Sequence, residues 1–335
     1  MKTFNTRRSL IALAVTTGAL LAGNAHAQDP GVTVYNDGPA AAAAVSSYWT
    51  AERLAKAQPM PLGVVKAPDA TASSYGTSVL DFTRSRITPQ SANTAAPYRY
   101  AGKLFFTIPG QGNFQCSASV VRNRLIVTAA HCMYSAGIGF HTNWIYIPGY
   151  DGAQSTVAKQ EPYCRWSWSY GIVPTNWIST SGSLPNKTDF GLLEMTDRSC
   201  NGFTAATRIS SVTGRFTVAT NHAGNTHVTM LGYPGNFDSG LIMQRNDSSD
   251  RRTTSVANAV EYGSDMTQGS SGGPWVENFG TGAAPTGSYA TRNAVVAVTS
   301  YIYNDPAIKI LGASGFNSDF SSILSSACAN KPDNC

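Results

Sequence analysis

The sequence predicts an all-β protein, and three observations point to that class. From about residue 98 onward, short runs rich in β-branched and aromatic residues recur along the chain. Turn-forming pairs such as Pro109-Gly110 and Pro234-Gly235 lie between these runs. Hydrophobic residues make up 42% of the 335 residues and charged residues only 13%, so a sizeable core is available. Many short strands with turn signals between them are typical of a β-sandwich or β-barrel.

Five runs have the clearest strand pattern, and they are residues 103–107, 124–128, 144–147, 227–231 and 293–299. One helical window follows them near the end of the chain. Asn317 or Ser318 can cap that helix, and Phe320, Ile323 and Leu324 share one of its faces. We therefore expect a C-terminal helix packed on a β domain.

The first 27 residues have the pattern of a secretory signal peptide. Lys2, Arg7 and Arg8 form a basic start, residues 9–22 form a short apolar stretch, and Ala25-His26-Ala27 is a small-x-small cleavage site. The alternative is a transmembrane anchor, but the apolar stretch is shorter than the about 20 residues that a span needs. We expect a secreted or periplasmic protein that has no membrane contact after signal removal.

Residues 28–96 differ in composition from the rest, because Ala, Ser, Thr and Pro fill much of this segment. A short helical window covers residues 46–57, with Trp49 and Leu54 as its apolar positions. Two interpretations stay open: a pro-segment that masks the following domain or helps it to fold, or a flexible extension. Residues 97–335 then form the β domain.

Charge gives no argument for a nucleic-acid partner. The first 27 residues hold three of the 24 Lys and Arg and none of the 19 Asp and Glu, so the remainder has a net charge of only +2. No basic stripe with interleaved aromatic residues is present. We expect a monomer whose partners are protein or peptide substrates.

Six cysteines follow the signal, and an even number in an exported chain favours three disulfides. They are Cys116, Cys132, Cys164, Cys200, Cys328 and Cys335. Their spacing alone does not decide among the 15 pairings that six cysteines allow. No Cys-x-x-Cys pair occurs, so we do not expect these cysteines to form a metal site. We expect no metal or organic cofactor, and calcium dependence stays open.

The strongest chemical signal is the segment 269–274, with the sequence Gly-Ser-Ser-Gly-Gly-Pro. A serine nucleophile needs a base, a tight turn and amide groups that face the developing oxyanion. Ser271 is the candidate nucleophile, and the amides of Gly269 and Ser271 are the candidate oxyanion donors. The segment also fits the Gly-x-Ser-x-Gly elbow of α/β-hydrolases, whose histidine follows the serine. No histidine follows Ser271, so the base must lie upstream.

His131 is the candidate base. An apolar run leads into Ala129 and Ala130, whose small side chains leave space beside the imidazole, and Cys132 follows. The other histidines after the signal lack such surroundings, and they are His141, His222 and His227. His222 and His227 are interpreted as loop residues rather than zinc ligands.

Asp189 is the candidate acid, because it directly precedes an apolar run whose start could place it beside His131. Its role would be to fix the imidazole tautomer and to stabilise the imidazolium. An isolated Asp is also common in turns. Asp197 and Glu194 are the fallback candidates.

Three segments resemble the histidine, aspartate and serine boxes of the trypsin-like and glutamyl endopeptidase-like serine peptidases of bacteria and fungi. They are residues 128–132, 189–193 and 269–274, in that order along the chain. Residues 232–234 also resemble a strand-end motif of the glutamyl endopeptidase-like branch. The resemblance implies two six-stranded antiparallel barrels, a cleft between them and a C-terminal helix. It further implies a Cys116–Cys132 disulfide, which leaves Cys164–Cys200 and Cys328–Cys335 as the simplest remaining pairs.

Two departures from this resemblance affect regulation and specificity. Animal trypsins carry Asp immediately before the catalytic serine, to pair with a new N-terminal Ile, but this position is Ser270. Cleavage at Arg86-Ile87 therefore lacks its buried acid partner, and removal of a pro-segment is expected to act by uncovering the cleft.

Specificity stays open among basic, small or apolar, and glutamate side chains. Asp265 lies six residues before Ser271, where trypsin has its specificity acid, but the accompanying cysteine is absent. Thr299, Ser300 and Tyr301 are expected in the opposite pocket wall, where Tyr301 could narrow the entrance. That wall lacks the histidine of glutamate-specific relatives.

These signals together predict an exported serine endopeptidase that acts through an acyl-enzyme. A non-catalytic binding module on the same fold and a secreted esterase with the same triad are the alternatives. Labelling with a fluorophosphonate separates the binding module from both enzymes, and digestion of casein separates the peptidase from the esterase.

Overall fold

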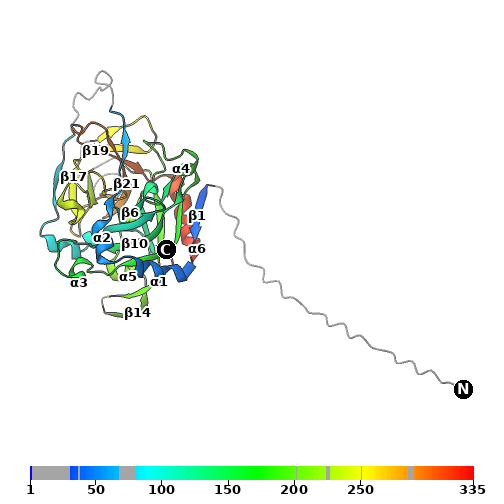
Figure 1. The fold of residues 1–335 in the computed structure, drawn as a ribbon. Helices are drawn as coiled ribbons and strands as arrows, with labels where there is room; N and C mark the ends of the chain where they lie inside the picture. The colour runs from blue at the N-terminus through cyan, green and yellow to red at the C-terminus, as the bar shows by residue number, and fades with distance from the viewer. Residues whose placement is uncertain are drawn as a thin grey trace.

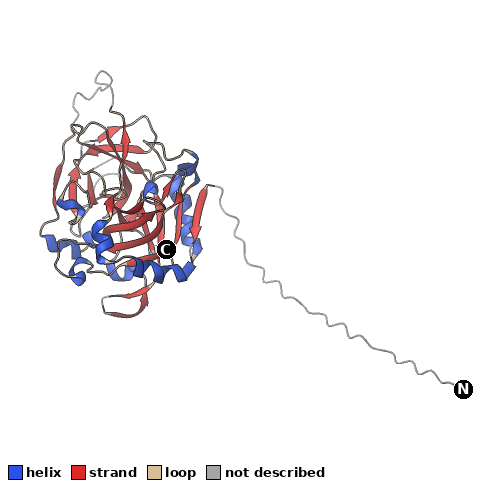
Figure 2. Ribbon diagram, in the orientation of Figure 1, coloured by secondary structure: helices blue, strands red, loops and turns tan. Residues whose placement is uncertain are grey.

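The computed structural model describes Met1 and residues 31–36, 38–67, 80–200, 202–223, 227–249, 251–285 and 290–335. The expected signal peptide lies outside the described residues apart from Met1. Strands fill the interior of the domain, and the helices lie around its periphery (Figure 2).

Six antiparallel strands form a closed barrel in the first half of the domain. They are β5 (Ala101–Ile108), β6 (Gly112–Val120), β7 (Leu125–Thr128), β10 (Thr142–Pro148), β11 (Trp166–Pro174) and β12 (Gly191–Met195). The order is β11-β10-β5-β6-β7-β12, and β12 pairs with β11 to close the ring. Figure 1 shows this barrel in its lower half, around β6 and β10.

A second, curled sheet forms the other half of the domain, around β17, β19 and β21 in Figure 1. Its order is β18-β19-β22-β21-β20-β16-β17-β4. These strands are β18 (Arg251–Thr253), β19 (Ala259–Gly263), β22 (Ile310–Gly315), β21 (Ala294–Tyr303), β20 (Pro274–Glu277), β16 (Val228–Gly232), β17 (Gln244–Ser248) and β4 (Thr83–Arg86). The predicted all-β class is confirmed, although the hydrogen bonds of the described residues leave this second barrel open.

Shorter elements connect and cover the two sheets. The strands are β8 (Tyr134–Ser135), β9 (Gly139–Phe140), β13 (Arg198–Cys200), β14 (Phe203–Thr207) and β15 (Thr217–Val218). The helices are α3 (Val157–Gln160), α4 (Thr175–Ser179), α5 (Ile209–Thr213), η1 (Gln90–Thr94), η2 (Tyr98–Tyr100), η3 (Ala130–Cys132) and η4 (Asp238–Gly240).

The sequence pattern accounts for the core. The five predicted strand runs overlap β5, β7, β10, β16 and β21. In β7 all four residues are buried, and in β21 nine of the ten are, because these strands are covered on both faces. Trp144 and Trp168 are at most 1% exposed and meet edge to face at 4.6 Å inside the first barrel. In the second sheet, Trp275 makes a similar contact with Tyr262.

A buried amine connects the two halves. Lys103 on β5 is 3% exposed, and its Nζ donates to the carbonyl oxygen of Gly240 at 2.7 Å. The rings of Phe105 and Tyr150 each lie 5.1 Å from Nζ, close enough for cation–π attraction. Burial lowers the pKa of Lys103 to about 7.

Residues 31–67 and 80–86 add strands to both sheets. In this segment, β1 (Val32–Asn36) pairs with β11, and β4 pairs with β17. The helices are α1 (Gly38–Tyr48) and α2 (Ala51–Lys56), and the remaining strands are β2 (Gln58–Pro59) and β3 (Gly63–Val65). The expected helical window thus divides at Trp49 and Thr50, where the Thr50 side chain caps α2 by accepting from the amide of Arg53. Trp49 is 1% exposed, and its Nε1 donates to the carbonyl oxygen of Asn143.

All three disulfides are present in the implied pairing. Cys116–Cys132 joins β6 to η3, Cys164–Cys200 joins the loop before β11 to β13, and Cys328–Cys335 closes the C-terminus. No cysteine is free.

The C-terminal helix α6 (Ser318–Asn330) begins where the sequence predicts. Asn317 caps it by accepting a hydrogen bond from the amide of Phe320 at 3.2 Å, and Phe320 and Ile323 are fully buried. In Figure 1 it lies beside β1 on the first barrel. None of the helices in the described ranges has the length and apolarity needed to cross a bilayer.

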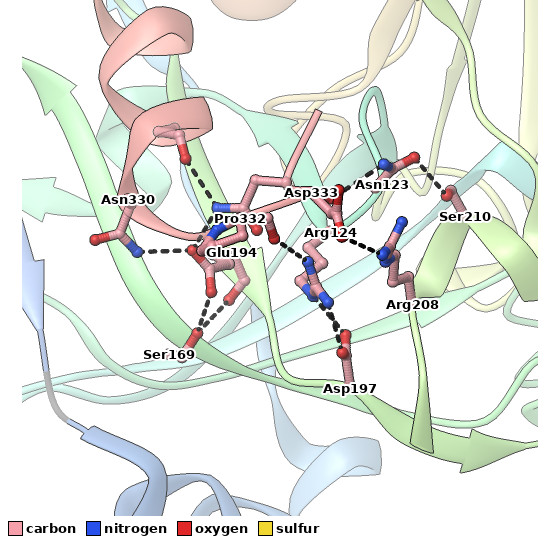
Figure 3. A network of polar contacts seen from close by, with 12 residues as sticks. Asn123, Arg124, Ser169, Glu194, Asp197, Arg208, Ser210, Asn330, Pro332 and Asp333 are labelled. Carbon is pink, nitrogen blue, oxygen red and sulfur yellow. Dashed lines mark hydrogen bonds and ion pairs between the residues drawn. The ribbon is translucent and has the colours of Figure 1, made fainter. Parts of the chain in front are cut away.

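A buried carboxylate fastens the C-terminal tail to the first barrel (Figure 3). Glu194 on β12 is 2% exposed and accepts from Asn330 and Asn334 at 2.8 and 2.7 Å. Ser169 donates to its other oxygen at 3.1 Å. Arg124 makes two bonds to Asp197 in the same network.

Replacement of Glu194→Ala is predicted to lower the free energy of unfolding by about 2 kcal/mol, because the buried amide of Asn334 and the less buried donors of Ser169 and Asn330 lose their acceptor. Chemical denaturation measures this loss. Asp333→Asn is the matched control in the same network, because the pair of Asp333 with Arg208 is solvent-exposed and should contribute less than about 1 kcal/mol. Asn also tolerates the positive φ of 61° at this position. Equal losses in the two variants would contradict the assigned role of Glu194.

Candidate active site

The structure brings His131 and Asp189 into direct contact. His131 lies in η3, directly after β7, and Asp189 lies directly before β12, which pairs with β7. The Nδ1 of His131 is 2.8 Å from Oδ2 of Asp189, and the His131 amide donates to Oδ1 at 2.9 Å. Ser300 Oγ also donates to Oδ2, at 2.6 Å. Because Asp189 is fully buried, these three donors compensate for its lost hydration.

The loop that carries Asp189 is held from the second half of the chain. Asn186 Oδ1 accepts from both the amide and the hydroxyl of Thr188. Ser314 on β22 donates to the carbonyl oxygen of Asn186, and the helix cap Asn317 donates to that of Lys187. The C-terminal helix therefore helps to fix the position of the acid.

Two glycines shape the loop that presents Ser271. Gly269 and Gly272 have φ angles of +91° and +74°, which side chains rarely adopt. A Cβ atom on Gly269 would lie 2.7 Å from the carbonyl oxygen of Tyr233, and one on Gly272 would lie 2.6 Å from the amide of Ala129. Glycine is therefore needed at both positions, because the backbone angle is positive and because a side chain would have no room.

Strand β6 of the first barrel positions this loop. The Ser117 amide donates to the carbonyl oxygen of Ser271 at 2.7 Å, and its hydroxyl donates to that of Gly269 at 2.9 Å. The same hydroxyl accepts from the amide of Tyr233 at 3.0 Å. Ser117 is a positioning residue that the sequence analysis missed, since an isolated Ser in a strand carries no distinctive signal.

Two buried polar atoms face the site without partners in the described part of the chain. They are Ser271 Oγ and His131 Nε2. Ser271 is fully buried, and His131 is 8% exposed. The expected hydrogen bond between them is not formed among the described residues. A serine hydroxyl and an imidazole nitrogen that no described group occupies stay available to a substrate, as nucleophilic catalysis requires.

The amide of Gly269, one of the two expected oxyanion donors, donates to the carbonyl oxygen of Met60 at 3.2 Å. Met60 lies between β2 and β3. A carbonyl from the N-terminal segment therefore occupies a position where a substrate oxygen is expected.

The four expected specificity residues have different surroundings. Asp265 lines a cavity of about 500 Å³, together with Met266 and Ile302. Its Oδ1 lies 2.9 Å from Nε of Arg84, which belongs to β4.

The three side chains expected in the pocket wall opposite Asp265 form hydrogen bonds within the protein. Thr299 accepts from Trp275 Nε1, and Ser300 bonds to Asp189. Tyr301 is fully buried, and its hydroxyl donates to Glu261 at 2.8 Å rather than lying at an entrance. A bulge between Thr299 and Tyr301 shifts the register of β21 against β22 at this point.

The other candidate acids and histidines make contacts that do not involve His131, and the candidate metal cluster is closed by a disulfide. Asp197 pairs with Arg124, and Glu194 binds the C-terminal tail, so neither fallback acid contacts His131. His222 and His227 are not brought together with His131, and His227 lies 3.4 Å from Asp247. The metal-type cluster of Cys116, His131 and Cys132 found in the described ranges contains a disulfide, so its thiolates are not free to bind an ion.

His141 supports the loop of His131, which the sequence analysis did not predict. It is fully buried, and its ring nitrogens lie 3.0 Å from the carbonyl oxygen of Cys132 and 2.9 Å from Ser135 Oγ. Its ring stacks on Phe106 at 5.0 Å. Burial lowers the pKa of His141 to about 4.

The sequence profile of the trypsin family matches residues 90–313 of this chain. Among solved structures, the chain is similar to the protease Anisep from Arthrobacter nicotinovorans, with 24% identity and a TM-score of 0.55 over 69% of this chain and 96% of that one. It is also similar to a thermostable serine protease from an extremophilic microorganism, with 21% identity and a TM-score of 0.56 over 72% and 100% of the two chains.

A third similar structure is a Glu endopeptidase, with 19% identity and a TM-score of 0.55 over 76% of this chain and 100% of that one. At these identities the likeness to the solved structures supports the fold alone. No curated protein sequence matches the chain significantly.

The buried imidazole of His141 predicts a loss of stability in acid. Because the folded-state pKa of about 4 lies below the usual 6.5, the unfolded chain binds more protons between these values. The free energy of unfolding should therefore fall as pH falls from 6.5 to 4. His141→Gln should weaken this dependence, measured by denaturant unfolding at several pH values. Ser135→Ala, which removes a partner without removing the imidazole, should lower stability and keep the dependence; an unchanged slope in His141→Gln would contradict the prediction.

Proposed function

This chain belongs to the trypsin family of serine proteases, and from that premise we propose that it is an exported serine endopeptidase with Ser271 as nucleophile, His131 as base and Asp189 as orienting acid. The observation that carries the proposal is the bond of Asp189 Oδ2 to His131 Nδ1. That bond leaves Nε2 free of partners among the described residues, in the site that also contains the unpartnered Ser271 Oγ.

The proposed reaction begins when a peptide carbonyl carbon approaches Ser271 Oγ. His131 Nε2 accepts the hydroxyl proton as Oγ attacks, and Asp189 holds the imidazole tautomer and stabilises the imidazolium. The amides of Gly269 and Ser271 then donate to the oxyanion. The proton on Nε2 passes to the leaving amine, and water hydrolyses the acyl-enzyme by the same route. Active-site hydrogen bonds often tighten only when substrate binds, so their absence in a substrate-free chain is compatible with this role.

Export is supported by the sequence of the first 27 residues and by the three disulfides, since disulfides persist in oxidising compartments. The same observations fit a periplasmic or an extracellular location. Mass spectrometry of the exported protein would identify the mature N-terminus.

The choice of serine is tested by labelling with a fluorophosphonate. Wild type and Ser270→Ala should both be labelled on long incubation, and Ser271→Ala should not, because only Ser271 lies on the proposed reaction path. Ser270 is the matched control: it is adjacent and equally buried, but its hydroxyl donates to the carbonyl oxygen of Thr267. In the mature exported form, Ser271→Ala should also reduce hydrolysis of casein by about 10⁶-fold.

Labelling of Ser271→Ala together with loss of labelling in Ser270→Ala would identify Ser270 as the nucleophile. No labelling of any variant would favour the binding module. Labelling of the mature exported form without digestion of casein, together with hydrolysis of small esters, would favour the esterase.

We also propose that Asp265 favours Lys or Arg before the cleaved bond and that Arg84 weakens this preference. Support comes from the carboxylate of Asp265 in the cavity wall and from its ion pair with Arg84. A carboxylate that already has a cationic partner attracts a second cation less strongly.

Arg84→Gln should therefore raise cleavage after Lys and Arg several-fold relative to cleavage after Leu, measured by digestion of a peptide library. Asp265→Asn in the Arg84→Gln background should remove the increase. An unchanged ratio in Arg84→Gln would exclude the weakening by Arg84, and an equal ratio in Arg84→Gln with and without Asp265→Asn would exclude Asp265 as a specificity acid.

A further inference from the structure

Residues 58–65, here called the strap, run across the site between the two sheets. The strap begins as β2, which pairs in parallel with β6 at Phe114 and Gln115. It ends as β3, which pairs in parallel with β21 at residues 301–303. The same short segment thus adds a strand to each half of the domain, directly over the loop that presents Ser271.

The middle of the strap is hydrogen-bonded to the catalytic machinery. The Met60 amide donates to the carbonyl oxygen of Gln115 at 2.9 Å, and the Met60 carbonyl oxygen accepts from the Gly269 amide at 3.2 Å. The donor that should stabilise a substrate oxyanion is therefore already engaged by the chain's own backbone.

Burial agrees with this arrangement. Leu62 of the strap is 2% exposed. The residual cavity beside His131, of about 210 Å³, has Met60, Pro61 and Gly63 in its own wall. A nucleophile that is fully buried, as Ser271 is, has no open path to a polypeptide substrate. The strap must leave before a peptide can lie along the same strands.

The strap is also well suited to stay in place. Pro59 and Pro61 restrict its backbone, which reduces the entropy lost on docking. On its N-terminal side, the buried Trp49 and Leu54 hold α1 and α2 against the first barrel. On its C-terminal side, β4 pairs with β17 over four residues. A segment anchored on both sides binds its site at a high effective concentration.

The peptide bond between Met60 and Pro61 resists cleavage by the site because of its chemistry. Its nitrogen belongs to Pro61, so the amide is tertiary and carries no N–H. In a cleavage reaction this nitrogen must accept the proton from His131, and the pyrrolidine ring crowds the approach to it. The strap can thus occupy the site without being an efficient substrate.

We propose that the strap is an autoinhibitory segment that occupies the catalytic cleft and that its displacement activates the enzyme. This inference rests on the proposed function, because inhibition requires an activity to inhibit. It differs from activation by a new N-terminal amine. Ser270 offers no carboxylate, and Ile87 is 2% exposed with its amide bonded to the carbonyl oxygen of Met243.

The first test opens the strap in the full chain. Met60→Pro removes the amide that donates to Gln115 and should raise the rate of fluorophosphonate labelling of Ser271 at least tenfold. Ala51→Pro is the matched control, since it places proline in the same segment at the first residue of α2, where proline is tolerated. This control should label at the wild-type rate. Hydrogen exchange of residues 62–65 reports independently whether the strap has opened.

The second test closes the strap. A Cβ atom on Gly235 would lie 3.3 Å from Cβ of Pro59, close to the spacing of a disulfide. Pro59→Cys with Gly235→Cys should therefore form a cross-link, verified by mass. The oxidised form should label at least tenfold more slowly than wild type, and mild reduction should restore the wild-type rate. Wild type taken through the same reduction controls for the native disulfides.

The outcomes separate the two proposals. Labelling of Met60→Pro at the Ala51→Pro rate, with faster exchange of residues 62–65, would overturn autoinhibition and leave the proposed function standing. Labelling of the cross-linked form at the wild-type rate would overturn it even if Met60→Pro failed to fold. Absence of labelling in an opened Met60→Pro chain would instead refute the proposed function, and the inference with it.

Discussion

The site depends on one buried carboxylate. Asp189 is enclosed by protein, so it must find hydrogen bonds to offset its desolvation, and it finds them in two parts of the fold. His131 supplies two donors from the first barrel, and Ser300 supplies one from β21 of the second sheet. A displacement of either half would leave a buried charge underpaired. Because the Asp189 carboxylate needs hydrogen-bond donors from both halves, the orientation of the His131 imidazole depends on how the two halves are placed relative to each other.

Local patterns were sufficient to predict much of this arrangement. The apolar runs predicted the strands because burial sets their composition, and the order of histidine, aspartate and serine boxes predicted which side chains meet. Gly269 and Gly272 could be recognised because a positive φ limits the choice of residue. The structure brings His131 and Asp189 together as expected, and the role of the triad in catalysis stays a prediction.

Other features depend on contacts between residues far apart, which no local pattern records. Ser117 looks like any strand serine, and its importance comes from meeting the loop of Gly269. Residues 28–96 were expected to be a pro-segment or a flexible extension, and neither interpretation specified strands in both sheets. The placement of Tyr301 depends on a bulge and on Glu261, which lies 40 residues away in the sequence.

Strand β4 also has a consequence for how the protein behaves in concentrated solution. It is the last strand of the second sheet and covers β17, and it carries the exposed Arg86. Charged side chains on such a border discourage other chains from adding to it. A form of the protein without β4 would expose the backbone of β17 and become prone to self-association. Solubility thus sets a limit on how much of the N-terminal segment can be removed when the protease is prepared.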